Sequence, residues 1–177
     1  ADLALQLYYD RTERNEALLR EARDTYDADF QHRFALGDRQ ELLWGLGYRL
    51  TRDRTTGSFA ASFDPENRSI DLFSAFLQDD LTLYEDRLRL TLGSKFEHND
   101  HTGFEFQPSA RLSWTPRPDH VVWAATSRAL RIPSRADEDV RLALLILPPD
   151  SLFSGSPVTL VTGEGQRELK AEKLYAL

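Results

Sequence analysis

The chain contains no cysteine and no methionine among its 177 residues. The absence of thiols excludes disulfide bonds and thiolate metal sites. Basic residues are in the minority, with 22 Lys and Arg against 29 Asp and Glu, and the net charge of −7 argues against non-specific binding to nucleic acid, which needs a basic surface. Because the first residue is not methionine, we expect the chain to be an internal piece of a longer protein.

Long apolar runs are also absent. The run at residues 142–147 is far shorter than the ~18 residues of a membrane-spanning helix, and no signal peptide is visible at the start of the chain. This run is either part of a packed loop or a small plug of hydrophobic structure. The mean hydropathy of −0.50 does not exclude a membrane protein, because a transmembrane β-barrel shows its apolar residues only at every second position.

The sequence has instead a strong alternation of apolar and polar residues. In residues 104–115 the even positions are apolar and the odd positions are polar, which predicts a long β-strand with two unlike faces. The proline-rich turn at 116–119 then leads into a second strand. Similar strand patterns, some cleaner than others, predict seven strands, at residues 1–11, 25–36, 41–52, 69–83, 87–99, 104–115 and 120–129.

Two glycines interrupt the third of these strands, and the alternation ends after Ala129. Gly45 and Gly47 predict a bend or a close approach of another group to the backbone. Residues 130–167 carry prolines and glycines without alternation and predict a long extracellular loop. Residues 168–177 predict the start of a further strand.

The lengths of the strands and of their connections indicate the fold class. The strands run to ten or more residues, against about five or six in soluble proteins, whereas a tilted membrane-crossing strand needs about 9–11. Successive strands point in opposite directions, so long and short connections emerge at opposite ends, as in outer-membrane barrels. We therefore expect an all-β, antiparallel up-and-down meander that is part of a transmembrane β-barrel. The long connections are 12–24, 53–68 and 130–167, the short ones are 37–40, 84–86 and 115–119, and 98–103 is intermediate.

Three short motifs resemble a known family. The sequence QPSARLSWTP at 107–116, the sequence SRALRIPS at 127–134 and the strand start LKAEKL at 169–174 are similar to the barrel domain of TonB-dependent outer-membrane receptors. The usual aromatic residue before Arg131 is replaced by Leu130, and Ala171 stands where the family often has proline. The family's barrel has about 22 strands, so the chain would supply part of one, without the plug domain.

The resemblance implies a location in the outer membrane of a Gram-negative bacterium, in contact with the lipid bilayer. It implies energy-coupled uptake of a scarce nutrient such as a ferric siderophore or cobalamin, with the TonB complex acting through the missing plug. A passive porin, a structural outer-membrane barrel and a soluble β-sandwich binding module remain alternatives. The isolated chain is expected to self-associate through its open strand edges.

The candidate site residues are three arginines. The candidate ligand contacts are Arg131, Arg111 and Arg49, but for Arg131 we expect instead a pair with a carboxylate at the end of its strand. A polar lumen is expected from residues on one face of the strands, which are Asp27, Asp29, Arg33, Arg49, Arg89, Glu97 and Arg111. Aromatic girdles at the membrane interface account for Trp44, Tyr48, Trp114 and Trp123.

Neither a metal site nor an active site is expected. The cluster of metal-capable residue types at Glu97, His98, Asp100 and His101 lies at a predicted loop tip, where such side chains are usually solvated. No nucleophile–base pair, phosphate-binding glycine loop or zinc ligand set is apparent in the sequence. We therefore expect a binding and transport protein without a cofactor, and not an enzyme.

Overall fold

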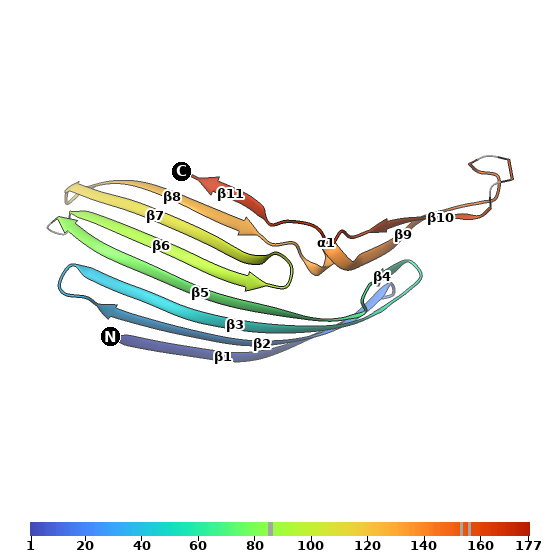
Figure 1. The fold of residues 1–177 in the computed structure, drawn as a ribbon, viewed down its shortest axis with the longest axis horizontal. Helices are drawn as coiled ribbons and strands as arrows, with labels where there is room; N and C mark the ends of the chain where they lie inside the picture. Colours follow the sequence, from blue (N-terminus) through green and yellow to red (C-terminus); the bar gives the residue numbers. More distant parts are fainter. Residues whose placement is uncertain (85–86, 153, 156) are drawn as a thin grey trace.

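A computed structural model describes residues 1–84, 87–152, 154–155 and 157–177 of the chain. Most of these residues form one eight-stranded antiparallel sheet in the order β1-β2-β3-β5-β6-β7-β8-β11 (Figure 1). The expected antiparallel meander is confirmed. The strands are β1 (Asp2–Asn15), β2 (Leu19–Ala35), β3 (Gln40–Gly57), β5 (Asn67–Tyr84), β6 (Leu88–Asn99), β7 (Gly103–Arg117), β8 (His120–Arg131) and β11 (Glu172–Ala176).

A smaller three-stranded sheet, ordered β10-β9-β4, lies beyond one end of the large sheet. The short helix α1 (Arg135–Asp139) leads into this smaller sheet from β8. No helix in the described part of the chain is long and apolar enough to cross a membrane. The bounds of the small strands are β4 (Ala61–Phe63), β9 (Val140–Leu147) and β10 (Thr159–Glu164).

Both possibilities for the apolar run at 142–147 are wrong. The run is strand β9, and it pairs with β10 in a projecting ribbon on which Leu144 is 62% and Ile146 is 55% exposed. The segment 130–167, expected as a loop, therefore contains a helix and two strands.

The pairing register of the large sheet keeps apolar residues together on one face. Leu5 lies opposite Phe30, Phe30 opposite Leu46, Leu46 opposite Ala75, and Ala75 opposite Phe96. Side chains directly opposite in an antiparallel pair share a face, so these residues form one continuous apolar row. The next row along the sheet faces the other way and is polar or small, and consists of Gln6, Asp29, Gly47, Ser74, Glu97 and Glu105.

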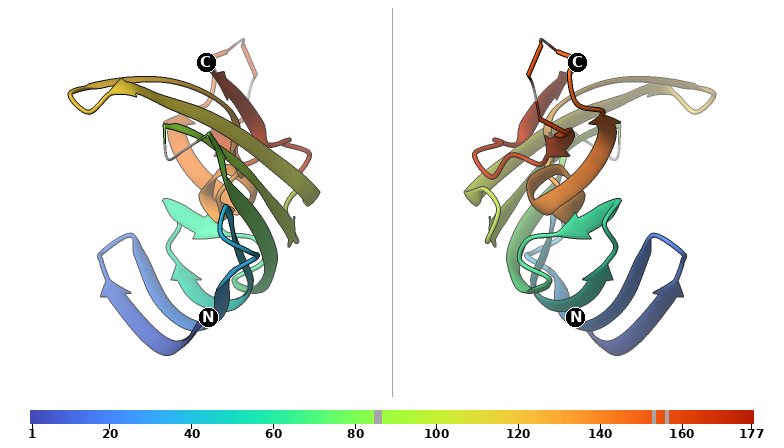
Figure 2. Two further views of the ribbon diagram at one scale, coloured as in Figure 1. Left: turned by 90° about the vertical axis from the view of Figure 1, so that its left-hand side faces the viewer. Right: turned by 90° about the vertical axis from the view of Figure 1, so that its right-hand side faces the viewer.

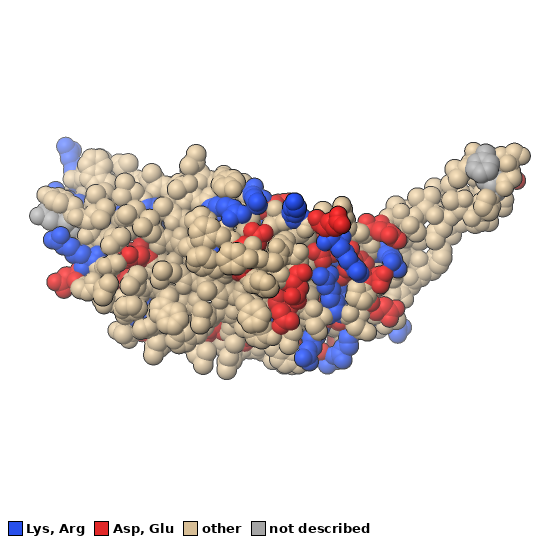
Figure 3. All heavy atoms as spheres, viewed as in Figure 1, with Lys and Arg blue, Asp and Glu red and all other residues tan. Residues whose placement is uncertain are grey.

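The apolar face is uncovered. Leu5 is 66%, Phe73 is 54% and Trp114 is 50% exposed, and Ala171 is the only buried aliphatic or aromatic residue among those described. Figure 3 shows this face as largely uncharged, with charged side chains gathered towards its ends. A β-sandwich would have a second sheet on this face, so that alternative is wrong.

Two of the expected long connections are mostly strand. β1 and β2 continue through residues 12–15 and 19–24 and leave a turn of only residues 16–18, and β3 and β5 narrow the expected 53–68 loop to residues 58–66, which include β4. The physical reason is charge pairing across the ladder: Arg11 lies opposite Asp24 and Arg14 opposite Glu21. The sheet therefore extends past its apolar face as a polar ladder.

Both glycines named from the sequence, Gly45 and Gly47, lie where another group approaches the backbone, as expected; a Cβ on Gly47 would lie 2.5 Å from the Ser74 hydroxyl oxygen. A Cβ atom on Gly45 would lie 2.4 Å from the Phe76 ring and 2.5 Å from the carbonyl oxygen of Phe30. The absence of a Cβ atom at Gly45 thus leaves room for the Phe76 ring beside the backbone.

The large sheet is an open, curved wall. Its turns at 36–39 and 118–119 lie at one end, which we call the short-turn end; α1 and the β9–β10 ribbon lie at the other, which we call the loop end (Figure 1). Views from both ends show that the sheet does not close on itself (Figure 2). Strands β1 and β11 form its two free edges.

Candidate functional site

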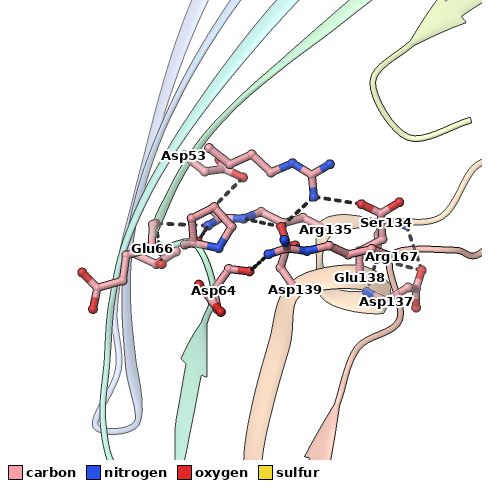
Figure 4. Close-up of polar contacts among 12 residues, drawn as sticks. Asp53, Asp64, Glu66, Ser134, Arg135, Asp137, Glu138, Asp139 and Arg167 are labelled. Atoms are coloured by element: carbon pink, nitrogen blue, oxygen red, sulfur yellow. Dashed lines mark hydrogen bonds and ion pairs between the residues drawn. The ribbon is translucent and has the colours of Figure 1, made fainter. Parts of the chain in front are cut away.

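Buried charged residues gather at the loop end, where β2, β3, β5, the β6–β7 turn and α1 meet. Asp53 is 2%, Asp139 is 3%, Glu138 is 4% and Arg135 is 6% exposed. This is unusual, because charged side chains are almost never fully buried unless they are paired. We call this group the ionic cluster; it consists of Arg23, Asp53, Arg68, His101, Arg135, Glu138, Asp139 and Arg167. Figure 4 labels five of them, Asp53, Arg135, Glu138, Asp139 and Arg167.

Helix α1 presents three of the cluster residues, and its first turn is fixed by a capping box. The backbone N–H and the hydroxyl of Ser134 donate to Asp137 Oδ2 at 2.8 and 2.9 Å, and the Asp137 N–H donates back to the Ser134 hydroxyl. The bond from the Ser134 backbone, followed by that from its hydroxyl, lowers the pKa of Asp137 below its usual value. A negative charge also suits the first turn of a helix.

Asp139 is the centre of the cluster, and its side chain is fully buried. Arg68 donates to Oδ2 at 2.6 Å, Arg167 donates to Oδ1 at 3.0 Å, and Arg135 Nε lies 3.7 Å from Oδ2. Arginines from β5, from α1 and from the segment after β10 therefore converge on one carboxylate (Figure 4). Such convergence offsets the cost of burying the charge.

Arg135 joins α1 to the large sheet and to the β4–β5 connection. Its guanidinium donates to the carbonyl oxygens of Pro65 and Glu66 at 2.5 and 3.1 Å and lies 3.4 Å from Asp53 on β3. It also lies over the Phe63 ring, 4.9 Å from the ring centroid.

Glu138 connects α1 to the β6–β7 turn. Its Oε2 accepts from Arg68 at 2.8 Å and lies 2.8 Å from His101 Nδ1. Burial alone would lower the pKa of Arg68, but its hydrogen bonds to Asp139 and Glu138 outweigh burial and raise the pKa above the usual value. Arg68 therefore stays charged, as its two carboxylate partners require.

The cluster has the chemistry of an anchor. Its arginines pair with carboxylates and carbonyl oxygens of the same chain, although Nε and Nη1 of Arg135 lie near carboxylates without forming a hydrogen bond. Close contact extends to the backbone, since a Cβ on Gly165 would lie 2.5 Å from the Glu138 carbonyl carbon. The cluster thus fixes the base of the β9–β10 ribbon to the loop end of the sheet.

The three arginines proposed from the sequence lie at different positions between the short-turn end and the loop end of the large sheet. Arg49 is near the middle of β3, where its Nε donates to Asp27 on the polar face at 2.7 Å. Arg111 lies towards the short-turn end, beside a polar hollow of about 580 Å³ that Arg89 and Asp80 also line. Arg131 ends β8 at the loop end. The structure does not bring the three together, and their contact with a ligand stays a prediction.

Arg131 has carboxylate partners at the end of its strand, so that expectation is confirmed. Its Nη1 lies 2.7 Å from Glu172 of β11, and its Nη2 lies 3.6 Å from Asp137. These pairs lie where residues 132–171 leave the large sheet after β8 and return to it at β11. This segment carries the β9–β10 ribbon.

The four metal-capable residues near 97–101 do not converge. Glu97 accepts from Gln107 and lies 2.6 Å from Lys95, Asp100 accepts from the backbone of Asp71, and His101 faces Glu138. His98 shares the apolar face with Phe73. Within residues 1–84, 87–152, 154–155 and 157–177, no group of three His, Asp or Glu side chains is placed to hold a metal ion.

The ionic cluster itself was not foreseen from the sequence. The run SRADED at 134–139 contains the Ser-x-x-Asp spacing of a capping box and so held the signal for α1. The partners on β3 and β5 had no such signal, because Arg68 and Asp139 are 71 positions apart.

Comparison with known proteins identifies the family. A model described as "TonB dependent receptor-like, beta-barrel" matches residues 2–175. The chain belongs to the TonB-dependent receptor family. It contributes strands of the family's β-barrel, and members of the family are transport receptors rather than enzymes. No curated protein matches the sequence.

Solved TonB-dependent receptors share the fold at low sequence identity. The siderophore receptor PirA from Pseudomonas aeruginosa superposes with a TM-score of 0.66 at 16% identity, and PirA from Acinetobacter baumannii with 0.63 at 16%. The ferric enterobactin receptor PfeA, in complex with BCV-L6, gives a TM-score of 0.66 at 21% identity. The matches cover 88–97% of this chain but only 24–30% of those chains.

Proposed function

We propose that the chain forms part of the wall of a Gram-negative outer-membrane receptor for energy-coupled uptake of a scarce nutrient. The cargo class is a ferric siderophore, cobalamin or a similar small ligand. The observation that carries the proposal is the register of the large sheet, which keeps an apolar row and a polar row apart across six successive strands.

The two faces of the sheet contact different environments. The apolar face contacts the lipid bilayer, where lipid-facing charges are costly, and the polar face lines a hydrated lumen. Asp27 and Arg49 pair on this lumen face, and Arg111 lies on it closer to the short-turn end. Energy reaches the barrel from the TonB complex through a plug domain supplied elsewhere in the receptor.

The loop end is the external side in this proposal. There the ionic cluster holds α1 and the β9–β10 ribbon in a fixed position relative to the wall. External segments held in this way provide a preorganised entrance for the ligand, and preorganisation lowers the cost of binding. Arg131 lies at this entrance.

The test is uptake by intact cells. A strain lacking the gene is given the full-length receptor, and accumulation of radioactive iron is followed with a panel of iron-loaded siderophores, alongside labelled cobalamin. We expect accumulation of at least one cargo that stops when TonB is deleted. Accumulation that continues without TonB, together with open conductance in a planar bilayer, would show a passive porin instead.

A variant that removes one positive charge tests the lumen face. Arg111→Gln is expected to lower the rate of uptake while leaving the amount of receptor in the membrane unchanged. Arg117→Gln removes the same charge at the short-turn end and serves as the matched control. Equal rates in both variants would remove Arg111 from the proposed ligand path.

A further inference from the structure

Two hollows follow one another along the outer, apolar side of the wall. The first is a groove of about 540 Å³ whose lining is almost entirely apolar. Its floor includes Ala28 and Ala75, whose small side chains leave space between larger neighbours. The larger lining side chains are Leu5, Phe30, Leu46, Tyr48, Phe73, Phe96 and Phe104.

The second hollow, of about 510 Å³, lies nearer the loop end and is polar. Arg52 lies in it with its guanidinium 5.9 Å from the centroid of the Tyr26 ring. In the part of the chain that the structure describes, no carboxylate oxygen lies within 4.0 Å of Arg52. Its positive charge is therefore available to a ligand.

The neighbouring charges leave this hollow positive. Asp24 is neutralised within the chain, since it accepts from Tyr9 at 2.7 Å and from Arg54 at 2.5 Å, and Arg11 lies 3.6 Å away. Arg11 also pairs with Glu13 at 2.6 Å. Arg11, Arg52 and Arg54 thus face the carboxylates of Asp24 and Glu13. The hollow is also lined by Arg68 and Asp53, which pair within the ionic cluster.

On the β5 side, the nearest acid on the same face is Asp71, which accepts a hydrogen bond from the Tyr48 hydroxyl at 2.6 Å. The adjoining Asp100 accepts from the Asp71 backbone. The excess of positive charge is therefore confined to the β1–β3 side of the hollow.

The spacing of the two hollows matches an amphiphile lying along the strands. Arg52 and Tyr48 are four residues apart on β3, which corresponds to about 13 Å at about 3.3 Å per residue. Tyr9 and Tyr26 line the charged hollow and Tyr48 lines the apolar groove, so tyrosines lie where the two hollows adjoin. Tyrosines favour the level at which membrane headgroups meet acyl chains.

We propose that these two hollows together bind one phosphorylated, acylated amphiphile of the surrounding membrane. The phosphate lies at Arg52, because a guanidinium binds phosphate through its planar, multiple donors. An acyl chain fills the groove over Ala28 and Ala75. The site is separate from the lumen and does not depend on the identity of the transported nutrient.

The test uses the full-length receptor in detergent, titrated with three probes and followed by native mass spectrometry. Phosphatidic acid carries both phosphate and chains, diacylglycerol carries the same chains alone, and glycerol 3-phosphate carries the phosphate alone. We expect saturable binding of one phosphatidic acid, weaker binding of diacylglycerol and none of glycerol 3-phosphate. Equal binding of the first two probes, or binding of glycerol 3-phosphate alone, would overturn the proposal.

Variants separate the two halves of the site. Arg52→Gln is expected to weaken binding of phosphatidic acid about fivefold, the effect of one arginine at an anionic membrane surface, without changing binding of diacylglycerol. Ala75→Leu fills the groove with an apolar side chain and is expected to weaken both. Arg117→Gln, at the opposite end of the sheet, is expected to change neither. An unchanged affinity for phosphatidic acid in Arg52→Gln would contradict the assignment of the phosphate.

Discussion

At the scale of single residues, similar arginine–carboxylate pairs contribute very different amounts to the stability of this chain. The side chain of Asp139 is fully buried and that of Arg68 is 19% exposed, whereas those of Arg131 and Glu172 are 64% and 70% exposed. Exposed pairs contribute little because water screens them and both side chains lose freedom. Breaking a buried pair leaves an uncompensated charge.

This contrast predicts unequal effects of two equivalent substitutions. Arg68→Met removes one guanidinium from both Asp139 and Glu138, and is expected to cost about 3–5 kcal/mol of local stability at the loop end. Arg131→Met is expected to cost less than about 1 kcal/mol. Hydrogen exchange of residues 134–147 in the full-length receptor measures both, as loss of protection in the first variant and near-normal protection in the second. Similar losses in the two variants would contradict this ranking.

The sequence predicted which face a residue occupies but not its partner. Alternation placed Asp27 and Arg49 on the polar face, where the structure pairs them. It could not pair Arg23 with Asp53, 30 positions away, or Arg68 with Asp139, because the period of a strand fixes direction and says nothing of long-range contacts.

At the scale of elements, the strands proved longer than their apolar pattern. The pattern ends near residue 11 of β1, yet the hydrogen-bonded ladder continues to Asn15. Backbone pairing needs no apolar side chain, and opposite charges across the ladder stabilise it in water. Apolar alternation therefore indicated the extent of the exposed apolar band rather than the length of the strand.

Helix α1 has a predicted acid dependence through Asp137. The pKa of this carboxyl is lower in the folded chain than its unfolded value of about 3.9, so its contribution to stability is present above that pH. The contribution is lost as the pH falls through the lowered folded value. We expect α1 to loosen in acid below about pH 4.

A nitroxide label measures this loosening. Ala136 is exposed on α1, and the chain has no cysteine, so Ala136→Cys gives one labelling site within it. Spectra should show an immobile label at pH 7 and a mobile one in acid. In Asp137→Asn the step should be reduced, and Asp119→Asn at the short-turn end should leave it intact. An undiminished step in Asp137→Asn would assign the loosening to the buried carboxylates.

At the scale of the whole molecule, the sheet is a wall with two unlike sides. Neighbouring residues of one strand face different media, so adjacent substitutions should differ sharply. Leu5→Arg places a charge on the apolar face and is expected to cost about 2–4 kcal/mol, whereas Gln6→Arg on the polar face is expected to cost little. Urea-induced unfolding of the full-length receptor from lipid vesicles measures both, and equal midpoints would contradict the assignment of the faces.

The sequence predicted this wall well because one period governs all its strands. It did not predict the β9–β10 ribbon or its anchoring, since a run of six apolar residues fits a strand, a loop or a buried helix turn equally. Self-association of the isolated chain through the free edges β1 and β11 stays a prediction.

The pairing of β8 with β11 separates the architecture of the wall from that of the segment between these two strands. Residues 132–171 leave the wall and return to it at neighbouring positions, where Arg131 lies opposite Glu172. The entropy of closing a loop rises only slowly with its length. Insertions or deletions within this segment therefore leave the register of every wall strand unchanged, so it can diversify between related receptors while the barrel stays constant.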